Sequence, residues 1–328
     1  MRPKVFLTRA LPPAPMARLH DETELTVNSD DRVLSRAELL EGVRGKDGLL
    51  CLLTDTVDAE ILDAAPELRI VSNYAVGFNN IDVPAATERG VAVTNTPDVL
   101  TDTTADMAFA LLLAASRRVV DGHDLVRSGE WQGWGPLQLL GGEVTGATLG
   151  LVGLGRIGRA MVPRAKGFGM EVVYWNRTRL ASEEEAELGI EYASFGEVLQ
   201  RSRFVSVHVA ATPETRHMVD ARALRLLGSE GYLINTARGE VVDELALVEA
   251  LRGGVIAGAG LDVYEHEPSL TAGLAESPNV VLAPHLGSAT HATRSAMGNL
   301  AVENLLAVLR RERPPNLVNP DVLRNRQG

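Results

Sequence analysis

Short apolar runs alternate along the chain with stretches in which apolar residues recur every three or four positions. A short apolar run bounded by turn residues is typical of a buried strand, and the wider spacing indicates a helix. Their alternation predicts βαβ units and parallel sheets, and therefore an α/β fold. Strands are expected at residues 5–8, 49–53, 70–73 and 91–95 in the first part of the chain and at 148–152, 171–175, 204–209, 232–235, 256–262 and 280–283 in the second.

Helices are expected between these strands, most clearly at residues 36–42, 58–64, 103–117, 243–252 and 290–311. Residues 103–117 are apolar nearly all round, which predicts a helix buried between layers. The segment 290–311 is predicted as an amphipathic helix that ends before Pro314. Residues 128–146 contain tryptophans and many glycines but show no period, so they are expected to form an irregular excursion.

The composition narrows the class of protein. The 328 residues are 45% hydrophobic and 23% charged, which is typical of a globular protein with one large or two medium domains. Lys and Arg number 32 against 43 Asp and Glu, and the net charge of −11 disfavours a nucleic acid or an anionic membrane as partner. The longest apolar stretch, residues 107–115, is about half a membrane span. The first apolar run is too short for a signal peptide, so we expect a cytoplasmic protein.

Neither a disulfide nor a metal site is expected. The single cysteine, Cys51, excludes an internal disulfide and a cysteine-rich metal site. Its place in the run Gly48-Leu-Leu-Cys-Leu-Leu53 predicts a position in the core. No two of the seven histidines have a convincing metal-ligand spacing with acidic residues.

A glycine-rich turn opens the second series of strands and helices. The motif Gly153-Leu-Gly-Arg-Ile-Gly158 follows a predicted strand and begins a predicted helix, the context in which this spacing binds a dinucleotide. The first glycine permits a tight turn, the second lets the backbone approach a pyrophosphate, and the third allows close packing. A strand–turn–helix with a purely structural role is the alternative. The candidate cofactor contacts here are Leu154, Gly155, Arg156, Ile157 and Gly158.

The following strand ends in residues that bear on the choice of cofactor. NAD-binding units usually place an acid here for the ribose hydroxyls, whereas this chain has Asn176 followed by Arg177, Thr178 and Arg179. Arginine can clamp a 2′-phosphate in two-point contacts, while a carboxylate would repel it. We therefore expect NADP(H) to be preferred, with NAD(H) possible. The alternative is that both arginines only decorate a solvated turn.

Three chemically capable side chains come just after predicted strands. Arg238, Glu267 and His285 each lie a few residues beyond a strand end. Because ligands of doubly wound sheets bind outside the carboxyl ends of the strands, these groups are expected at one edge. Each alone could be a surface or hinge residue.

Together these residue types suit the reduction of a 2-oxo acid. Arg238 can hold the substrate carboxylate and orient the carbonyl. His285 can donate a proton to the carbonyl oxygen, since histidine titrates near neutral pH. Glu267 can fix the tautomer and orientation of the imidazole and favour its protonated form.

The chain resembles the D-isomer-specific 2-hydroxyacid dehydrogenase family over essentially its full length. In that family the arginine, glutamate and histidine of these motifs form the catalytic set, which falls here on the three residues already named. The matching segments are Gly153-Leu-Gly-Arg-Ile-Gly158, His208-Val-Ala-Ala-Thr-Pro-Glu-Thr215, Asn235-Thr-Ala-Arg-Gly239, Gly260-Leu-Asp-Val-Tyr-Glu-His-Glu-Pro268 and Pro284-His-Leu-Gly-Ser288.

The resemblance implies a fold of two domains. One is a Rossmann-type dinucleotide domain with a doubly wound parallel sheet, expected at residues 101–285. The other is a smaller, flavodoxin-like α/β substrate domain that is discontinuous, expected at residues 1–100 and 286–328.

The resemblance also implies further contacts and a partner. It suggests that backbone N–H groups near Val76 and Gly77 hold the substrate carboxylate. The segments at 176–179 and at Trp134-Gly-Pro-Leu-Gln resemble glyoxylate/hydroxypyruvate reductases in particular, which are homodimers whose tryptophan can approach the partner's active site. The further cofactor contacts expected are Thr104, Thr236, Ala237, Asp262 and Gly287.

The expected function is therefore the NADPH-preferring reduction of glyoxylate and hydroxypyruvate. A 3-phosphoglycerate dehydrogenase, or another D-2-hydroxyacid dehydrogenase, is the enzymatic alternative. Such a phosphoglycerate enzyme often carries a regulatory C-terminal domain, and only 43 residues follow His285 here, since 328 − 285 = 43. A dinucleotide-sensing binding protein of the corepressor type shares the fold and is the non-enzymatic alternative.

Overall fold

The computed structural model describes residues 2–322. The chain forms two compact units, and the first is built from two separate segments. Unit 1 comprises residues 1–100 and 289–328, and unit 2 comprises residues 101–288. The chain therefore leaves unit 1 after Leu100 and returns to it at Ala289. No helix in the described part of the chain is both long and apolar enough to cross a membrane.

Within the described residues, unit 1 contains a parallel sheet of five strands in the order β2-β1-β3-β4-β5. This is the flavodoxin-like strand order. The strands are β1 (Lys4–Leu7), β2 (Glu24–Val27), β3 (Gly48–Cys51), β4 (Ile70–Asn73) and β5 (Ala92–Thr94). The helices are α1 (Pro13–Glu22), α2 (Arg36–Val43), α3 (Ala59–Asp63), α4 (Val83–Glu88) and α12 (His291–Leu309).

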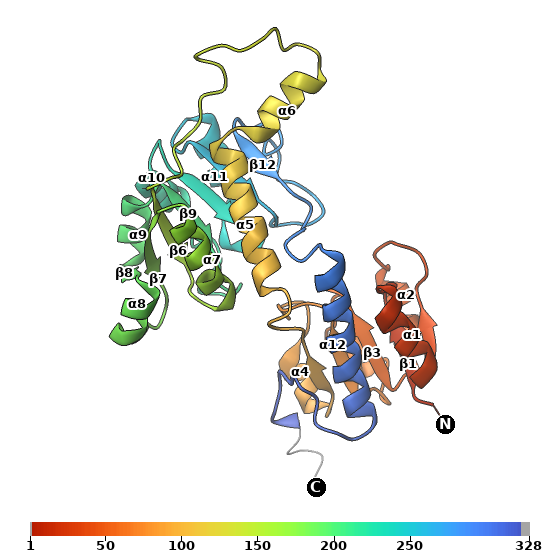
Figure 1. Cartoon of the computed structure of the whole chain (residues 1–328). Helices are drawn as coiled ribbons and strands as arrows, with labels where there is room; N and C mark the ends of the chain where they lie inside the picture. The colour runs from red at the N-terminus through yellow and green to blue at the C-terminus, as the bar shows by residue number, and fades with distance from the viewer. Residues whose placement is uncertain (1, 323–328) are drawn as a thin grey trace. The chain divides into compact units, whose positions relative to one another are not determined.

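The core of unit 1 lies on both faces of this sheet. Strands β3 and β4 are buried at every position because helices cover them on each side, as expected for a parallel sheet. Cys51 is fully buried, and burial raises the pKa of its thiol, so the expected core position is confirmed. Helix α12 packs on β3, β4 and α1 (Figure 1). It is buried along most of its length instead of being amphipathic, because it has both the sheet and α1 as neighbours.

Unit 2 contains, in the residues described, a parallel sheet of seven strands in the order β12-β11-β10-β9-β6-β7-β8. The strand order reverses beside β6, and ligands bind at such a point in doubly wound sheets. The strands are β6 (Thr148–Val152), β7 (Glu171–Trp175), β8 (Glu191–Tyr192), β9 (Phe204–Val207), β10 (Tyr232–Asn235), β11 (Gly258–Leu261) and β12 (Val280–Leu282). The helices are α5 (Thr101–Ser116), α6 (Val119–Arg127), α7 (Arg156–Gly167), α8 (Ser182–Leu188), α9 (Phe195–Arg201), α10 (Ala221–Leu227) and α11 (Glu244–Arg252).

Two helices of unit 2 differ in how they are covered. Helix α5 packs on β10, β11 and α7 and is largely buried, as its apolar sequence indicates. Helix α6 has no buried residue and leads into a largely exposed loop, residues 128–141, at the top of Figure 1. The sequence pattern does not predict α6. Helix α7 runs without a break through Pro163, where a kink or a loosened turn is expected from sequence.

Candidate active site

The glycine-rich turn after β6 has the geometry of a dinucleotide cradle. Gly153 has a φ of +97°, and a Cβ there would lie 2.8 Å from the backbone carbon of His208, so only glycine fits. A Cβ on Gly158 would lie 2.3 Å from the Gly153 oxygen. Around Gly155 there is open space for 4 Å, and this residue caps α7 without a side-chain hydrogen bond. The turn therefore presents helix amide groups to a phosphate with room for it to approach.

The loop after β7 gives the two arginines different surroundings. Asn176 accepts a hydrogen bond from the Leu154 N–H at 3.4 Å and so joins this loop to the glycine turn. Arg179 donates from Nε and Nη2 to the Glu185 carboxylate at 2.8 and 2.7 Å. Arg177 is exposed and makes no hydrogen bond or ion pair with the residues described. Of these two arginines, only Arg177 has a guanidinium that no carboxylate holds by a hydrogen bond within the described residues, and it interacts electrostatically with Glu214.

Arg238 lies at the end of β10 in a turn that its neighbours hold. Asn235 donates to the Arg238 carbonyl at 2.9 Å and accepts from the Ala237 N–H at 3.0 Å. A Cβ on Gly239 would lie 1.9 Å from the backbone of Tyr264, so glycine is required for this close packing. The packing brings the Arg238 turn against the loop that carries Glu267. Burial lowers the pKa of the Arg238 guanidinium, while the charges of Glu267 and Glu240 oppose that shift.

His285 and Glu267 form a hydrogen-bonded pair. The Nδ1 atom of His285 lies 3.0 Å from Oε2 and 3.2 Å from Oε1 of Glu267. Because the carboxylate holds Nδ1, the Nε2 atom makes no hydrogen bond within the described residues and can bind a ligand. Burial raises the pKa of Glu267, but the hydrogen bond and charge of His285, a backbone N–H and Arg238 outweigh it, and the net pKa lies below its usual value. Glu267 is therefore a carboxylate at neutral pH.

Asp262 holds the turn in which His285 lies. His285 has a φ of +55°, a left-handed conformation that is costly for a residue other than glycine. The Asp262 carboxylate accepts from the N–H groups of Leu286 at 2.6 Å and Gly287 at 2.7 Å, and its carbonyl accepts from the His285 N–H at 3.0 Å. Burial raises the pKa of Asp262, and the two amide hydrogen bonds oppose that shift.

Tyr264 links the loop of Glu267 to the segment that precedes His285, and the sequence pattern indicates no role for it. Its N–H donates to Glu267 Oε1 at 3.1 Å. Its hydroxyl donates to the Ala283 carbonyl at 2.9 Å, two residues before His285. Its place in a recognised motif is the one signal that could have drawn attention to it.

The structure gathers several of the expected cofactor residues at the same edge. A Cβ on Gly287 would lie 3.2 Å from Asp262 Oδ2 and 3.3 Å from Thr104 Cγ2, which places these three residues together. The buried hydroxyl of Thr236, which follows β10, has no hydrogen-bond partner among residues 2–322. A buried hydroxyl of this kind at the carboxyl end of a strand fits a site that accepts a polar ligand. The residues present therefore fit a nicotinamide dinucleotide.

Trp134 lies in the loop after α6. Its side chain is 84% exposed and makes no hydrogen bond or ring contact within the described residues. Val76 and Gly77 lie in unit 1, in the loop that follows β4.

Comparison with known proteins settles the family. A family model described as the NAD-binding domain of D-isomer specific 2-hydroxyacid dehydrogenases matches residues 109–287. A glyoxylate reductase from Thermococcus litoralis is 52% identical over 327 residues, which is 98% of each chain. The chain belongs to the D-isomer specific 2-hydroxyacid dehydrogenase family.

Solved structures agree with this dehydrogenase in fold. A protein from Thermus thermophilus is 46% identical with a TM-score of 0.90, over 96% of this chain and 99% of that one. The NADPH-dependent glyoxylate/hydroxypyruvate reductase from Sinorhizobium meliloti, solved with NADP and malonate, is 37% identical with a TM-score of 0.85, over 98% of both chains. The predicted family and fold class are confirmed, and the dehydrogenase is an NAD(P)-dependent oxidoreductase.

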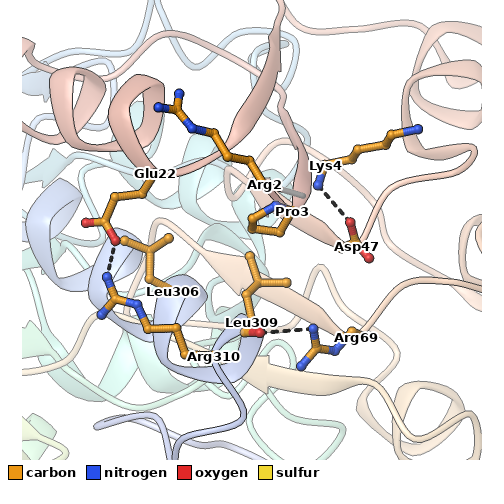
Figure 2. A pocket seen from close by; sticks show the side chains of 9 residues that line it. All are labelled: Arg2, Pro3, Lys4, Glu22, Asp47, Arg69, Leu306, Leu309 and Arg310. Atoms are coloured by element: carbon orange, nitrogen blue, oxygen red, sulfur yellow. Dashed lines mark hydrogen bonds and ion pairs between the residues drawn. The ribbon is translucent and has the colours of Figure 1, made fainter.

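A cavity of about 400 Å³ in unit 1 of the dehydrogenase is not the active site (Figure 2). It lies at the amino ends of β1, β3 and β4, whereas ligands of such sheets bind at the carboxyl ends. Its charged groups are largely engaged with one another or with the backbone. Arg310 pairs with Glu22, Asp47 accepts from the Lys4 N–H at 2.7 Å, and Arg69 donates to the Leu309 carbonyl at 3.0 Å.

Proposed function

We propose that this dehydrogenase reduces small 2-oxo acids, glyoxylate and hydroxypyruvate first, and prefers NADPH. The observation that carries the proposal is the His285–Glu267 pair in unit 2, with the Arg238 turn packed against the same loop. The relatives named above include a glyoxylate reductase that is 52% identical to this chain over nearly all of both chains.

Each side chain has a defined task in the proposed reaction. Arg238 holds the substrate carboxylate together with the N–H groups near Val76 and Gly77. The bound nicotinamide supplies the hydride to the carbonyl carbon. His285 gives the proton on Nε2 to the carbonyl oxygen, so the 2-oxo acid becomes a 2-hydroxy acid. Glu267 stabilises the protonated imidazole before transfer and fixes the ring so that Nε2 faces the substrate.

A variant of His285 tests the proposal. His285→Ala removes the proton donor, so kcat for glyoxylate with NADPH should fall by about 10²–10⁴-fold, the range of general acid catalysis. His20→Ala replaces an exposed histidine in unit 1 and is the control. Turnover close to that of the wild type in His285→Ala would refute the assignment. If 3-phosphoglycerate is oxidised faster than glyoxylate is reduced, the alternative dehydrogenase is the better description.

The preference for NADPH rests on the loop after β7. It carries Asn176 where an acid would repel a 2′-phosphate, and within the described residues no carboxylate holds the Arg177 guanidinium by a hydrogen bond. The relative from Sinorhizobium meliloti is NADPH-dependent and was solved with NADP. Initial rates with both cofactors measure the preference directly.

The proposal includes a homodimer. Helix α6 and the loop that follows expose apolar side chains that a monomer would leave in water. Trp134 is 84% and Leu137 81% exposed, and Leu140 is 64% exposed. In the proposed dimer this arm packs on the second copy, and Trp134 approaches the partner's active site. Leu137→Asp should weaken the dimer, and light scattering after gel filtration would then report a smaller mass. A monomeric wild-type protein would contradict this part.

A further inference from the structure

The loop after β4 has every carbonyl from residue 75 to residue 78 engaged by the protein. The four hydrogen bonds run from Thr96 N to Ala75 O at 2.9 Å, from Asn95 Nδ2 to Val76 O at 2.8 Å, from Asn73 Nδ2 to Gly77 O at 2.8 Å and from Ile81 N to Phe78 O at 3.1 Å. Two of these donors are asparagine side chains, and they bind carbonyls of a loop that is not part of the sheet.

The backbone N–H groups of the same residues, in contrast to the carbonyls, have no hydrogen-bond acceptor among the described residues. Within the described part of the chain, none of the N–H groups of residues 75–78 donates a hydrogen bond. Backbone N–H groups near a buried segment normally have a partner, and a row without one is suited to a ligand or to water. A series of such N–H groups in a loop forms an anion-binding concavity.

The carbonyl contacts determine where these N–H groups point. The peptide bonds of this loop are trans, and in a trans peptide the C=O and the following N–H point in opposite directions. Because Asn95 holds the Val76 carbonyl, the Gly77 N–H points away from Asn95. Because Asn73 holds the Gly77 carbonyl, the Phe78 N–H points away from Asn73.

Both asparagines are fixed by rigid parts of unit 1. Asn95 follows β5, and its carbonyl accepts from Asn304 Nδ2 at 3.0 Å. Asn304 is fully buried on α12, and its Oδ1 accepts from the Asn316 N–H at 3.0 Å. Asn73 ends β4, is fully buried and also donates to Asn80 Oδ1 at 3.2 Å. The two side-chain hydrogen bonds to the loop therefore come from the last residue of β4 and the residue after β5, and α12 holds the second of these in place.

We propose that Asn95 and Asn73 are positioning residues that aim the Gly77 and Phe78 N–H groups at the carboxylate of the substrate. This rests on the proposed function and extends the carboxylate donors to Phe78. A carboxylate has two oxygens that each accept more than one hydrogen bond, so adjacent N–H groups can hold it. Neither asparagine touches the substrate in this scheme. Each acts through a carbonyl, so its loss should affect substrate binding before it affects the chemical step.

Asn95→Ala tests the proposal because it removes the hydrogen bond from the half-buried Asn95 side chain to the Val76 carbonyl. The Gly77 peptide is then free to turn, and the loss of one hydrogen bond to a charged group should raise KM for glyoxylate about tenfold. The KM for NADPH should stay unchanged and kcat should change far less than KM. The inhibition constant of oxamate, a carboxylate of similar size that has no reducible ketone or aldehyde, should rise in parallel.

Asn319→Ala is the matched control. Asn319 is 5% exposed in the same unit, accepts from the Val93 N–H at 2.8 Å and donates to the Val91 carbonyl at 3.0 Å. Its side chain holds β5 and makes no hydrogen bond with the loop within the described residues. The control should lower the unfolding temperature and leave both KM values as in the wild type.

Asn95→Asp provides a second variant that keeps the shape of the side chain. It replaces the donor with an acceptor that repels the Val76 carbonyl, so KM for glyoxylate should again rise. A wild-type KM for glyoxylate in both Asn95 variants would overturn the positioning role. Failure of the wild-type enzyme to reduce any 2-oxo acid would instead overturn the proposed function, so the two failures are distinguishable.

Discussion

The sequence predicts that Arg177 and Arg179 both bind the 2′-phosphate of NADPH. Replacing them one at a time by alanine tests whether one of them instead stabilises the loop. Arg177 has no hydrogen bond or ion pair among the described residues. Arg179 is bound to Glu185 through two hydrogen bonds, and its guanidinium lies 5.2 Å from the centre of the Tyr192 ring. We therefore expect Arg177 to bind the 2′-phosphate of NADPH and Arg179 to hold the loop in shape.

The size of the Arg177 effect follows from the contact it would lose. A hydrogen bond to a charged group contributes roughly 1.5–3 kcal/mol. Since about 1.4 kcal/mol corresponds to a factor of ten, Arg177→Ala should raise KM for NADPH about tenfold to 150-fold. The KM for NADH should not change, because NADH has no 2′-phosphate.

The Arg179 effect should appear in stability and in its dependence on pH. Hydrogen bonds from Arg179 and then from Tyr174 lower the pKa of Glu185 to about 2 from its ordinary 4.5. A carboxyl whose pKa is lowered in the folded state stabilises the fold above its unfolded pKa, and this contribution is lost as the pH falls through the folded value. The unfolding temperature of the wild type should therefore drop between pH 4.5 and pH 2. In Arg179→Ala it should be lower at neutral pH and should drop less over this range.

Two measurements decide between these tasks. Initial rates with NADPH and NADH give the ratio of kcat/KM for each variant, and thermal unfolding across pH gives the stability. A rise in KM for NADPH that is equal in both variants, with no loss of stability in Arg179→Ala, would refute the division. An unchanged cofactor ratio in both variants would show that neither arginine reads the 2′-phosphate.

Three further substitutions test the geometry around His285. Glu267→Gln keeps the size of the side chain but weakens the contact that orients the His285 ring. In initial-rate assays kcat should therefore fall by less than in His285→Ala, with KM for NADPH unchanged. Asp262→Asn leaves one amide of the His285 turn without an acceptor, so both kcat and the unfolding temperature should fall, as calorimetry and rates would show. Tyr264→Phe removes the hydroxyl bond to Ala283 and should lower the free energy of unfolding by about 1 kcal/mol in a denaturant titration. An unchanged unfolding midpoint in Tyr264→Phe would mean that this bond contributes nothing.

The fold was predictable where burial leaves a strong pattern. Strands β3 and β4 are buried at every position and appear in the sequence as continuous apolar runs. Strand β2 lies at the sheet edge and alternates between exposed and half-buried positions, so it left too weak a signal to be recognised. Helix α6 has no buried residue, and therefore no apolar face that a periodic pattern could reveal.

The candidate site was predictable where position alone brings groups together. Arg238, Glu267 and His285 follow strand ends, and parallel strands share one carboxyl edge, so the sequence indicates their proximity. Tyr264 and Asn95 could not be found in this way. Their contacts depend on which carbonyl the side chain reaches, and the path of the backbone decides that, not the residue type.

Two backbone segments with proposed tasks, one in each unit, are held in opposite ways. In unit 2, Asp262 binds N–H groups of the turn that contains His285, so the backbone is satisfied and the imidazole is presented to the substrate. In unit 1, Asn95 binds a carbonyl of the Val76 loop, so the N–H groups are the part left for a ligand. Loss of Asp262 should therefore act on the proton donor and lower kcat, whereas loss of Asn95 should act on the anion donors and raise KM. The opposite pattern, with KM raised by the Asp262 variant and kcat lowered by the Asn95 variant, would contradict both assignments. It would mean that the His285 turn acts in substrate binding and the Val76 loop acts in the chemical step.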